Sequence, residues 1–407
     1  MARASTGKGR GVGSRIGWPL KIFVGILLVL LVLLVLNAFA LNNETKSADL
    51  NVPGAKLVNT TSGPLQVLDT GTPAGQRLRE ISTARKVRKS GVVGSFSATT
   101  NLLDSRIPIV LIHGSAGAIN WWDDLIPLLK PDHRVIAIDL LGYGGSEKPD
   151  SDYSMETQGN LVSQVLTRLG VKDAVLVGHS LGGSVVTSVA EQSPELVSGL
   201  VLIDSGPDRS YGGLSGAAKA SQTPILGQAL WRLAPDFMVR KNLSQGFAPG
   251  YDVPDKYVQD VREMTYPAYK KSYEGVEDYT DQKSLPDRLS QVGKPLLVIF
   301  GEEDQIYDAR EALSAYAAIP GAMTHLIPKS GHSPQIEAPE QTARAINNFT
   351  WTVARTKANQ QATKALQAKK RAAAAKERAA ARAKKQAARA KAKKSRQKSG
   401  KAKQQAQ

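Results

Sequence analysis

The stretch Ala174-Val-Leu-Val-Gly178-His179-Ser180-Leu181-Gly182-Gly183 decides the fold of this 407-residue chain. An apolar run typical of a buried strand enters the pattern G-x-S-x-G, and small residues that suit a helix follow it. A serine on such a cramped strand-to-helix turn projects out of the backbone, and glycine is the residue that fits beside it. The pattern therefore predicts that Ser180 is a catalytic nucleophile.

A serine nucleophile needs a base that accepts its proton, and two histidines follow Ser180 in the sequence. His325 lies within Met323-Thr-His-Leu-Ile-Pro328, which predicts a strand, so its side chain is expected to be packed or solvated. His332 lies in Lys329-Ser-Gly-His-Ser-Pro334, a loop directly after that strand. Because catalytic residues concentrate on loops held by a rigid scaffold, we predict that His332 is the base.

The base in turn needs an orienting carboxylate, and acidic residues follow two predicted strands downstream of the serine. The apolar run Pro295-Leu-Leu-Val-Ile-Phe300 predicts a buried strand and leads into Gly301-Glu302-Glu303-Asp304. Asp204 directly follows the strand predicted at residues 200–203 and is the rival candidate. Position in the chain favours the acidic turn after Phe300 but leaves its three carboxylates open.

Five motifs in chain order resemble the α/β-hydrolase superfamily, and the likeness extends from about Val58 to Trp351. Besides the serine turn, they are Ile109-Val-Leu-Ile-His113-Gly114, Asp139-Leu-Leu-Gly-Tyr-Gly-Gly-Ser146, Gly301-Glu-Glu-Asp304 and Gly331-His-Ser-Pro-Gln-Ile-Glu-Ala-Pro339. The resemblance implies an α/β fold, with a mostly parallel central sheet, helices on both faces, and a core divided between residues 58–206 and 295–354. We expect no cofactor and no metal ion, and the absence of cysteine excludes a thiol nucleophile.

The same resemblance implies roles within the site. It selects Asp304 as the acid that orients the base, and it places the oxyanion hole at the backbone N–H groups of Ser115 and Leu181. Two such donors matter because the loss of one typically costs about 10²–10³ in rate. His113 is expected to hold the turn that carries Ser115, and His179 to form part of the pocket wall.

The identity of the nucleophile narrows the chemistry. Relatives that open epoxides or displace halide carry aspartate at the position of Ser180, whereas a serine forms an acyl-enzyme and suits carboxylic esters. The same triad in relatives also hydrolyses carbon–carbon bonds or supports cofactor-free perhydrolysis of the haloperoxidase kind, so these activities remain alternatives. A third alternative is a non-catalytic surface-binding protein, against which the intact set of serine, acid and base argues.

A long insertion, residues 207–294, separates the sixth and seventh predicted strands. In relatives an insertion at this point forms a helical cap over the active site. Aromatic and methionine residues suit a lid that faces both a pocket and water, and here they are Tyr211, Trp231, Phe237, Met238, Phe247, Tyr251, Tyr257, Met264, Tyr266, Tyr269, Tyr273 and Tyr279. We therefore predict a cap that covers a mainly apolar pocket for a hydrophobic acyl substrate.

The N-terminal region predicts a membrane anchor. Residues 22–41 are almost entirely apolar and long enough to cross a bilayer, and five basic residues without an acid precede them within residues 1–21. This charge asymmetry predicts a single-pass protein whose N-terminus is cytoplasmic and whose catalytic domain lies outside, joined by a linker at residues 42–57. The alternative is a signal peptide, cleaved near Ala40 at Ala38-Phe-Ala40, which would release a secreted protein.

The C-terminal tail, residues 355–407, has a different composition. From residue 356 onward it carries 18 Lys and Arg residues and one acid, Glu377, so its net charge of +17 equals that of the whole chain. No apolar stripe is present, and like charges three and four positions apart repel one another, so we expect disorder, or a helix only on a polyanion. Lipid headgroups, anionic envelope polymers and nucleic acids are candidate partners, and a solubilising tail without a partner is the alternative.

Two further expectations concern smaller features. The segment 74–106 departs from the family pattern, and its many basic residues suggest contact with an anionic membrane face. His133 follows Pro131-Asp132 in a predicted turn and is expected to be exposed.

Overall fold

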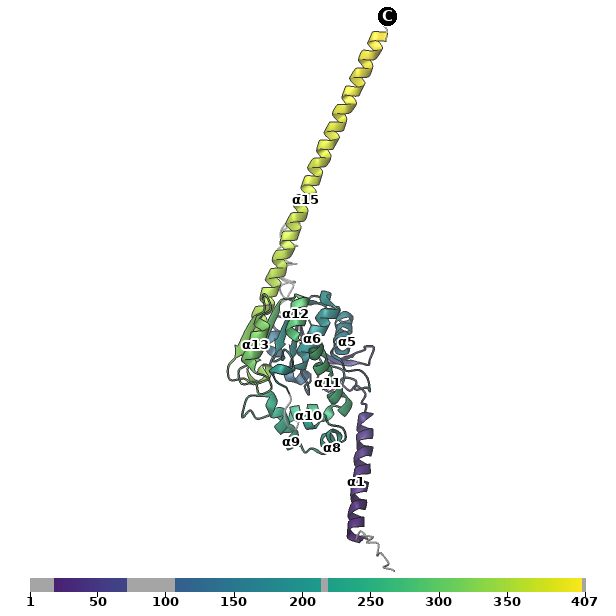
Figure 1. The fold of residues 1–407 in the computed structure, drawn as a ribbon. Helices are drawn as coiled ribbons and strands as arrows, with labels where there is room; N and C mark the ends of the chain where they lie inside the picture. Colours follow the sequence, from purple (N-terminus) through teal and green to yellow (C-terminus); the bar gives the residue numbers. More distant parts are fainter. Residues whose placement is uncertain (1–17, 72–106, 214–218, 405–407) are drawn as a thin grey trace, which may run out of the picture.

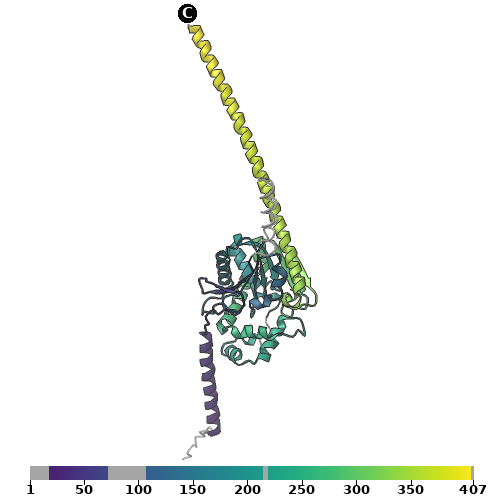
Figure 2. The same cartoon turned by 180° about the vertical axis from the view of Figure 1, so that it is seen from behind.

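The computed structural model describes residues 18–71, 107–213 and 219–404, with side chains as far as Lys391. Most of the basic N-terminal segment and the basic insertion at 74–106 lie outside the described residues. The central α/β body carries two projecting helices, α1 (Trp18–Asn42) and the distal part of α15 (Pro339–Gln404), which point in opposite directions (Figure 1 and Figure 2).

Eight strands form one sheet in the order β1-β2-β4-β3-β5-β6-β7-β8. Their bounds are β1 Lys56–Val58, β2 Leu65–Asp69, β3 Ile109–Ile112, β4 Val135–Ile138, β5 Ala174–His179, β6 Val197–Ile203, β7 Leu296–Gly301 and β8 Met323–Ile327. β1 and β2 pair antiparallel, as do β2 and β4, and the remaining pairs are parallel. The central strands are buried on both faces, which explains their continuous apolar sequences and confirms the predicted mostly parallel sheet.

Helices cover both faces of this sheet. One face carries α5 (Met155–Arg168), α6 (Leu181–Gln192), α12 (Leu285–Val292) and α13 (Ala309–Ala317), and the other carries α4 (Ile126–Leu129) and the first part of α15. Side chains of a strand point alternately to the two faces of the sheet. In β3, Val110 and Ile112 pack on the face covered by α5, α6, α12 and α13, whereas Ile109 and Leu111 pack on the face covered by α4 and α15.

The cap consists of α8 (Leu226–Leu233), α9 (Asp236–Leu243), α10 (Asp255–Glu263) and α11 (Tyr266–Gln282), inserted between β6 and β7. Its aromatic residues have two roles. Phe247 and Tyr257 are buried and pack beside Trp121 of the body, whereas Trp231 and Tyr269 stack at the wall of a cavity. The last helix of the insertion, α12, packs on α6 and so belongs to the layer that covers the sheet.

Helix α1 is slightly longer than the predicted span of 22–41, and among the described residues it is the one helix long and apolar enough to cross a membrane. Nearly all of its side chains are exposed, so it is not a core helix. Its last turn is different, because Ala38 and Leu41 are buried and Asn42 accepts a hydrogen bond from Gln228 of α8 at 2.8 Å. The end of α1 is therefore docked on the cap.

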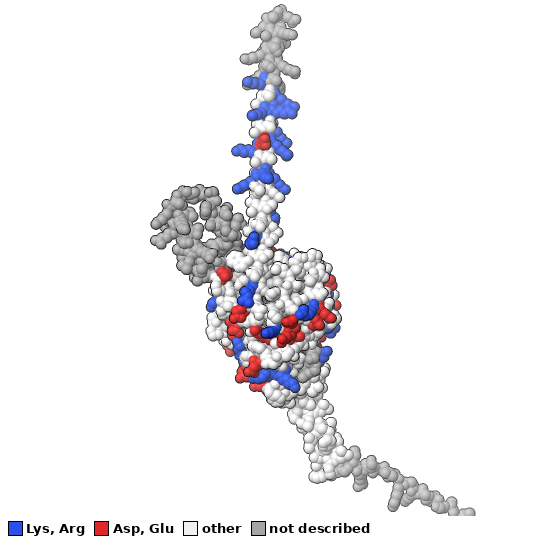
Figure 3. All heavy atoms as spheres, turned by 90° about the vertical axis from the view of Figure 1, so that its left-hand side faces the viewer, with Lys and Arg blue, Asp and Glu red and all other residues white. Residues whose placement is uncertain are grey.

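The tail corrects one expectation. Residues 355–404 were expected to be disordered, but they continue α15 as one helix to Gln404. Phe349 and Val353 of the same helix pack on the body, so the tail extends an existing helix without the cost of nucleation, and its Ala, Lys, Arg and Gln residues have high helix propensity. Every described side chain from Asn359 to Lys391 is exposed, and Figure 3 shows the basic residues distributed along this projecting helix.

Candidate active site

Ser180 occupies the turn between β5 and α6 in a strained backbone conformation, with φ 50° and ψ −118°. A Cβ atom on Gly178 would lie 2.2 Å from the carbonyl oxygen of Gly182, and one on Gly182 would lie 2.3 Å from that of Ile112. The flanking glycines are therefore required by close backbone contacts, as the sequence pattern predicts. Both Ser180 and the next residue, Leu181, line the same cavity.

His332 and Asp304 form a buried hydrogen-bonded pair. The Nδ1 atom of His332 donates to Oδ2 of Asp304 at 2.8 Å, and the two side chains are 5% and 0% exposed. Burial raises the pKa of Asp304, but the charge on His332 and hydrogen bonds from His332, Ile306 and Tyr307 outweigh it, so the pKa lies below its ordinary value. Asp304 is thus ionised and fixes the orientation of the His332 ring, which lines the cavity together with Ser180.

The competing candidates lie in other environments. His325 is exposed on β8, the edge strand of the sheet, and Glu302 and Glu303 are exposed on the acidic turn. Asp204 is fully buried, and its Oδ1 accepts a hydrogen bond from the backbone N–H of Gly301 at 2.9 Å. The carboxylate that is hydrogen-bonded to His332 is therefore that of Asp304 and not that of Asp204.

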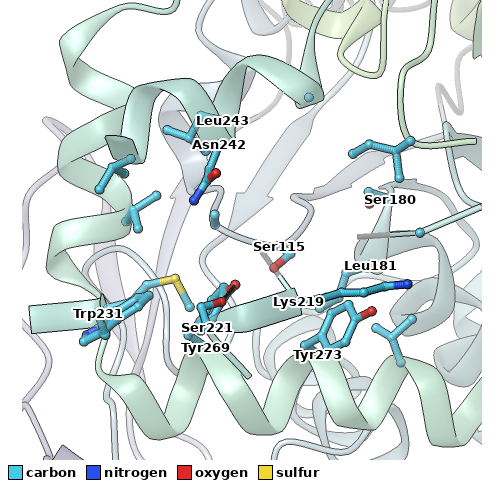
Figure 4. A pocket seen from close by; sticks show the side chains of 18 of the residues that line it. Ser115, Ser180, Leu181, Lys219, Ser221, Trp231, Asn242, Leu243, Tyr269 and Tyr273 are labelled. Atoms are coloured by element: carbon cyan, nitrogen blue, oxygen red, sulfur yellow. Dashed lines mark hydrogen bonds between the residues drawn. The ribbon is translucent and has the colours of Figure 1, made fainter. Parts of the chain in front are cut away.

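The turn after β3 approaches the nucleophile closely. A Cβ atom on Gly114 would lie 3.0 Å from Cβ of Ser180, so the backbone of this turn packs against the serine. Ser115 follows and lines the cavity, and Figure 4 shows it between Ser180 and Trp231. Leu181 begins α6, where a backbone N–H has no acceptor within the helix. Ser115 and Leu181, the predicted oxyanion donors, thus line the same cavity as Ser180.

Buried polar residues hold the loops around this turn. His113 accepts the backbone N–H of Leu140 at its Nε2 atom, at 3.1 Å, so its Nδ1 carries the proton and donates to the carbonyl oxygen of Gly114 at 2.8 Å. Burial lowers the pKa of His113 to about 4, so the ring is neutral near pH 7. Asp139 accepts the backbone N–H of Gly145 at 2.9 Å. His113 thus has the structural role expected for it.

Two other histidines also have defined environments. His179 lines the cavity, as expected. Its Nε2 lies 2.7 Å from the carbonyl oxygen of His332, and since a carbonyl oxygen can only accept, this nitrogen is the donor. Burial lowers the pKa of His179 to about 3, so the ring is neutral and carries this one proton. The expectation for His133 was wrong, because this residue is only 2% exposed and its Nδ1 lies 3.0 Å from the carbonyl oxygen of Ile107. The ring of Trp351 from α15 covers it.

Glu337 of α14 (Pro334–Glu337) lies within the histidine motif but was not predicted to have a role. Its carboxylate accepts backbone N–H groups of Gly331 and Ser333, both at 3.1 Å, and so brackets His332 on either side. The same carboxylate accepts the N–H of Ala248 in the cap at 2.7 Å. Glu337 therefore fixes the loop of the candidate base to the cap.

Asp260 of α10 was also missed. It accepts hydrogen bonds from the indole N–H of Trp121 at 3.0 Å and from the side-chain amide of Asn120 at 2.9 Å. Trp121 lines the cavity, and its ring lies 5.9 Å from that of His179. Burial raises the pKa of Asp260 to about 7. Only the fold reveals this link between the cap and the body, because 139 positions separate Trp121 from Asp260.

The cavity above Ser180 has a volume of about 770 Å³, which is in the range of small-molecule sites. Leu230, Trp231 and Leu243 of the cap line the part remote from the serine, and Figure 4 shows Trp231 and Leu243 on the side opposite Ser180. The lining also includes Leu41, at the end of α1. The cavity therefore offers apolar side chains on the side away from the nucleophile.

Two aspartates and one histidine that lie close together are residue types that commonly bind metal ions. Asp204, Asp304 and His332 each offer one ligand atom, and these atoms lie within 4.8 Å of one another. However, the 2.8 Å contact between Asp304 and His332 is a direct hydrogen bond. Two ligands of one tetrahedral zinc ion would lie roughly 3.3 Å apart, so this geometry fits a hydrogen-bonded pair better than a metal site.

Comparisons with known proteins agree with this geometry. Residues 107–339 match the family model of the alpha/beta hydrolase fold. A 2-hydroxy-6-oxo-6-(2'-aminophenyl)hexa-2,4-dienoic acid hydrolase of Metapseudomonas resinovorans is 29% identical over 247 residues, covering 60% of this chain and 83% of the relative. A 2-hydroxymuconate semialdehyde hydrolase of Pseudomonas sp. (strain CF600) is 29% identical over 265 residues, covering 61% and 89%.

A solved structure extends the likeness to the fold as a whole. A putative aryl esterase from Burkholderia cenocepacia superposes with a TM-score of 0.56 at 20% sequence identity, covering 74% of this chain and 98% of that one. The family model spans more than half of the chain and includes the serine turn, the acidic turn and the histidine loop. The chain therefore belongs to the α/β-hydrolase family and is a hydrolase of that fold.

Proposed function

We propose that this protein is a membrane-anchored serine hydrolase that cleaves carboxylic esters through an acyl-enzyme. The observation that carries the proposal is the position of Ser180, on a strained turn in the same cavity as a buried His332–Asp304 pair. A strained serine, a histidine oriented by an ionised carboxylate and two nearby backbone donors are the parts that acyl transfer needs.

The proposed reaction has two halves. The hydroxyl of Ser180 attacks the ester carbonyl while His332 accepts its proton at Nε2, and the N–H groups of Ser115 and Leu181 stabilise the oxyanion. His332 then gives the proton to the departing alcohol, which leaves the acyl group on the serine. A water molecule, activated by the same histidine, hydrolyses this intermediate. Asp304 stays ionised throughout and stabilises the imidazolium form of His332.

The cavity supports a hydrophobic acyl group as the part of the substrate that is recognised. Apolar side chains line the compartment remote from Ser180, and the volume exceeds what an acetyl group fills. We expect kcat/KM on p-nitrophenyl esters to rise from acetyl to medium-length acyl chains. A preference for acetyl over every longer chain would contradict this part of the proposal.

Labelling by a fluorophosphonate probe tests the nucleophile. Wild-type protein should be labelled, and Ser180→Ala should not. Ser221→Ala is the matched control, because Ser221 also lines the cavity but hydrogen-bonds Tyr269 at 2.8 Å and lies on the cap. Equal labelling of wild type and Ser180→Ala would reject the assignment, whereas loss in both variants would indicate a damaged pocket.

A second candidate function is hydrolysis of a carbon–carbon bond on the same residues. It is favoured by the relatives from Metapseudomonas and Pseudomonas, whose names describe hydrolases of this kind. A third use of the triad is peroxide-dependent halogenation. Turnover of a p-nitrophenyl ester, of 2-hydroxymuconate semialdehyde and of a halogenation substrate, measured with one enzyme preparation, separates the three. A dominant kcat/KM on the semialdehyde would replace the ester proposal.

The anchor forms part of the proposal. Helix α1 is apolar and exposed over most of its length, which a bilayer would cover. Cleavage after Ala40 would cut through the turn that is docked on the cap, where Leu41 is 3% exposed and Asn42 bonds Gln228. N-terminal sequencing of the mature protein is the test, and a new terminus at Leu41 would exclude the anchor. The basic residues that precede α1 favour a cytoplasmic N-terminus.

We also propose a polyanion as the partner of the basic tail. Helix α15 leaves the body on the side opposite α1, so the tail points away from the membrane that α1 would cross (Figure 1). This direction favours an anionic polymer over the headgroups of that membrane.

A further inference from the structure

One edge of the cap exposes large apolar side chains. It is formed by the start of α8 and by the turn from α8 to α9, and we refer to it as the α8–α9 edge. The exposed fractions are 37% for Ile225, 53% for Leu226, 72% for Leu233, 69% for Phe237 and 37% for Met238. A cluster of this kind on a soluble domain usually marks a contact with a protein or a membrane.

The candidate membrane helix lies beside this edge. The last turn of α1 contacts α8, with Asn42 bonded to Gln228 and Leu41 buried. Figure 1 and Figure 2 both place α8 and α9 at the end of the body from which α1 extends. A bilayer that contains α1 would therefore meet the body at the α8–α9 edge.

The charges at the edge are compatible with a lipid surface, since its exposed carboxylate, Asp236, is paired with Arg262 at 2.8 Å. Arg232 lies in the last turn of α8, and Lys241 lies in the last turn of α9. Both side chains are exposed next to the apolar residues. Basic groups that flank inserted apolar side chains gain from the negative potential of anionic lipid headgroups.

The cavity connects this edge with the nucleophile. Its lining includes Leu41 at the end of α1, Leu230 and Met238 of the cap, and Ser180 at the other limit. Met238 belongs both to the lining and to the exposed residues of the edge. An apolar molecule at the edge would thus reach the serine within one cavity, whose lining combines apolar side chains with polar ones.

We propose that the α8–α9 edge sits in the surface of the bilayer that α1 crosses, and that the acyl substrate enters the cavity from this bilayer. The second half of the proposal rests on the proposed ester hydrolase function, whereas the first half depends only on α1 as an anchor. The bilayer is the favoured occupant, because the docked end of α1 brings it to this edge. A second copy of the chain is the alternative that the experiment tests.

The chain contains no cysteine, so single cysteines can be introduced into the full-length protein without removing any. Leu233→Cys and Phe237→Cys carry an environment-sensitive fluorophore on the edge. Met323→Cys is the matched control, because Met323 is 44% exposed at the amino end of β8, remote from the cap. Each variant is reconstituted in vesicles of phosphatidylcholine and phosphatidylglycerol, with and without lipids that carry a nitroxide in the upper acyl chain.

We expect nitroxide lipids to quench the labels at 233 and 237 several-fold more than the label at 323. Equal quenching at all three positions would overturn the proposal. The protein-to-lipid ratio is also varied. Quenching should be independent of it, whereas protection of the 233 and 237 labels that grows with protein density would assign the edge to a second copy.

An activity measurement tests substrate entry. The variant Leu233→Ser/Phe237→Ser changes two residues that do not line the cavity. We expect KM for a long-chain ester dissolved in the vesicles to rise on the order of tenfold, with kcat on a water-soluble short-chain ester unchanged. An unchanged KM on the vesicle ester would refute entry from the bilayer. Absence of activity on both esters in wild type would instead contradict the proposed function, while the quenching result would still stand.

Discussion

The carboxyl groups of Asp204 and Asp304 lie side by side, with oxygen atoms within 4.8 Å, at the ends of the neighbouring strands β6 and β7. Burial raises the pKa of Asp204 well above its ordinary value, and the charge of Asp304 raises it further. The pKa of Asp304 is lowered by its contacts with His332. Asp204, oriented by the N–H of Gly301, is therefore the carboxyl group of the two that binds a proton more readily.

This pairing predicts different effects for two substitutions of Asp204. Asp204→Asn keeps an acceptor for Gly301 and a donor toward Asp304, so kcat should remain within about threefold of wild type. Asp204→Leu leaves the buried N–H of Gly301 unpaired, and we expect it to lose about 1–3 kcal/mol of stability. Asp304→Asn should instead reduce kcat by about 10³–10⁴-fold, because the His332 ring loses its ionised partner. Kinetics and thermal unfolding of the three variants provide the check.

A large loss of kcat in Asp204→Asn, with stability unchanged, would show that Asp204 and not Asp304 is the working acid.

Asp260 predicts a pH-dependent stability. Folding raises its pKa from 3.8 to about 7, so between these values the folded protein holds a proton that the unfolded chain has released. The free energy of unfolding therefore decreases as the pH rises through this window. Asp260→Asn has no proton to lose and keeps an acceptor for the indole N–H of Trp121. We expect its Tm at pH 8 to exceed that of wild type by about 2–4 °C, with a smaller difference at pH 4.

Thermal unfolding of both proteins from pH 4 to pH 8 tests this prediction. Parallel pH profiles for wild type and Asp260→Asn would contradict it.

Glu337 predicts that the geometry of the base depends on a carboxylate that does not touch the substrate. Glu337→Ala leaves the N–H groups of Gly331, Ser333 and Ala248 without their acceptor, and the loop that carries His332 loses its fixed position. A shift of about 1 Å in a catalytic group can cost 10²-fold, so kcat should fall by about 10–10²-fold with KM little changed. Glu337→Gln, which retains one acceptor oxygen, should recover part of the loss. Equal activity in wild type, Glu337→Ala and Glu337→Gln would show that the position of the His332 loop does not depend on Glu337.

The glycines of the serine turn predict a steric effect. In Gly182→Ala the new methyl group would lie 2.3 Å from the carbonyl oxygen of Ile112, which cannot move without disturbing β3. We expect a loss of about 1–3 kcal/mol of stability and reduced labelling of Ser180 by a fluorophosphonate. Gly246→Ala is the control, because nothing lies within 4 Å of the position that its methyl group would take. Equal Tm values for the two variants would contradict the steric argument.

The sequence predicts those parts of the site that depend on local pattern. Strand β5 and the turn at Ser180 follow from an apolar run and from glycines that the backbone requires. Asp304 follows a buried strand and His332 follows the edge strand β8, and the choice of Asp304 over its neighbours needed the resemblance to a family. The arrangement of the sheet can therefore be predicted from the order of the motifs along the chain.

Long-range contacts were beyond prediction. Asp260 has no sequence signal that connects it with Trp121, and none connects His133 with Trp351 of α15, whose ring lies against it. The docking of α1 on α8 depends on the packing of the cap, which no local pattern encodes. The helical tail was missed for a different reason, because charge repulsion was weighed without the packed helix that the tail continues.

The structure of the tail predicts that its removal abolishes the binding of a polyanion without affecting catalysis by the body. Lys357 still contacts the body through Asp173 at 2.6 Å, whereas every described side chain from Asn359 onward is exposed. A chain that ends at Ala358 should therefore keep the Tm and the kcat/KM of the full-length protein on a soluble ester, while its net charge falls from +17 to +1. Binding to polyphosphate should be lost, and in the full-length protein it should weaken with added salt. A full-length variant with Gln in place of each Lys and Arg after Ala358 is the control for length, and its binding to polyphosphate would disprove a charge-based role for the tail.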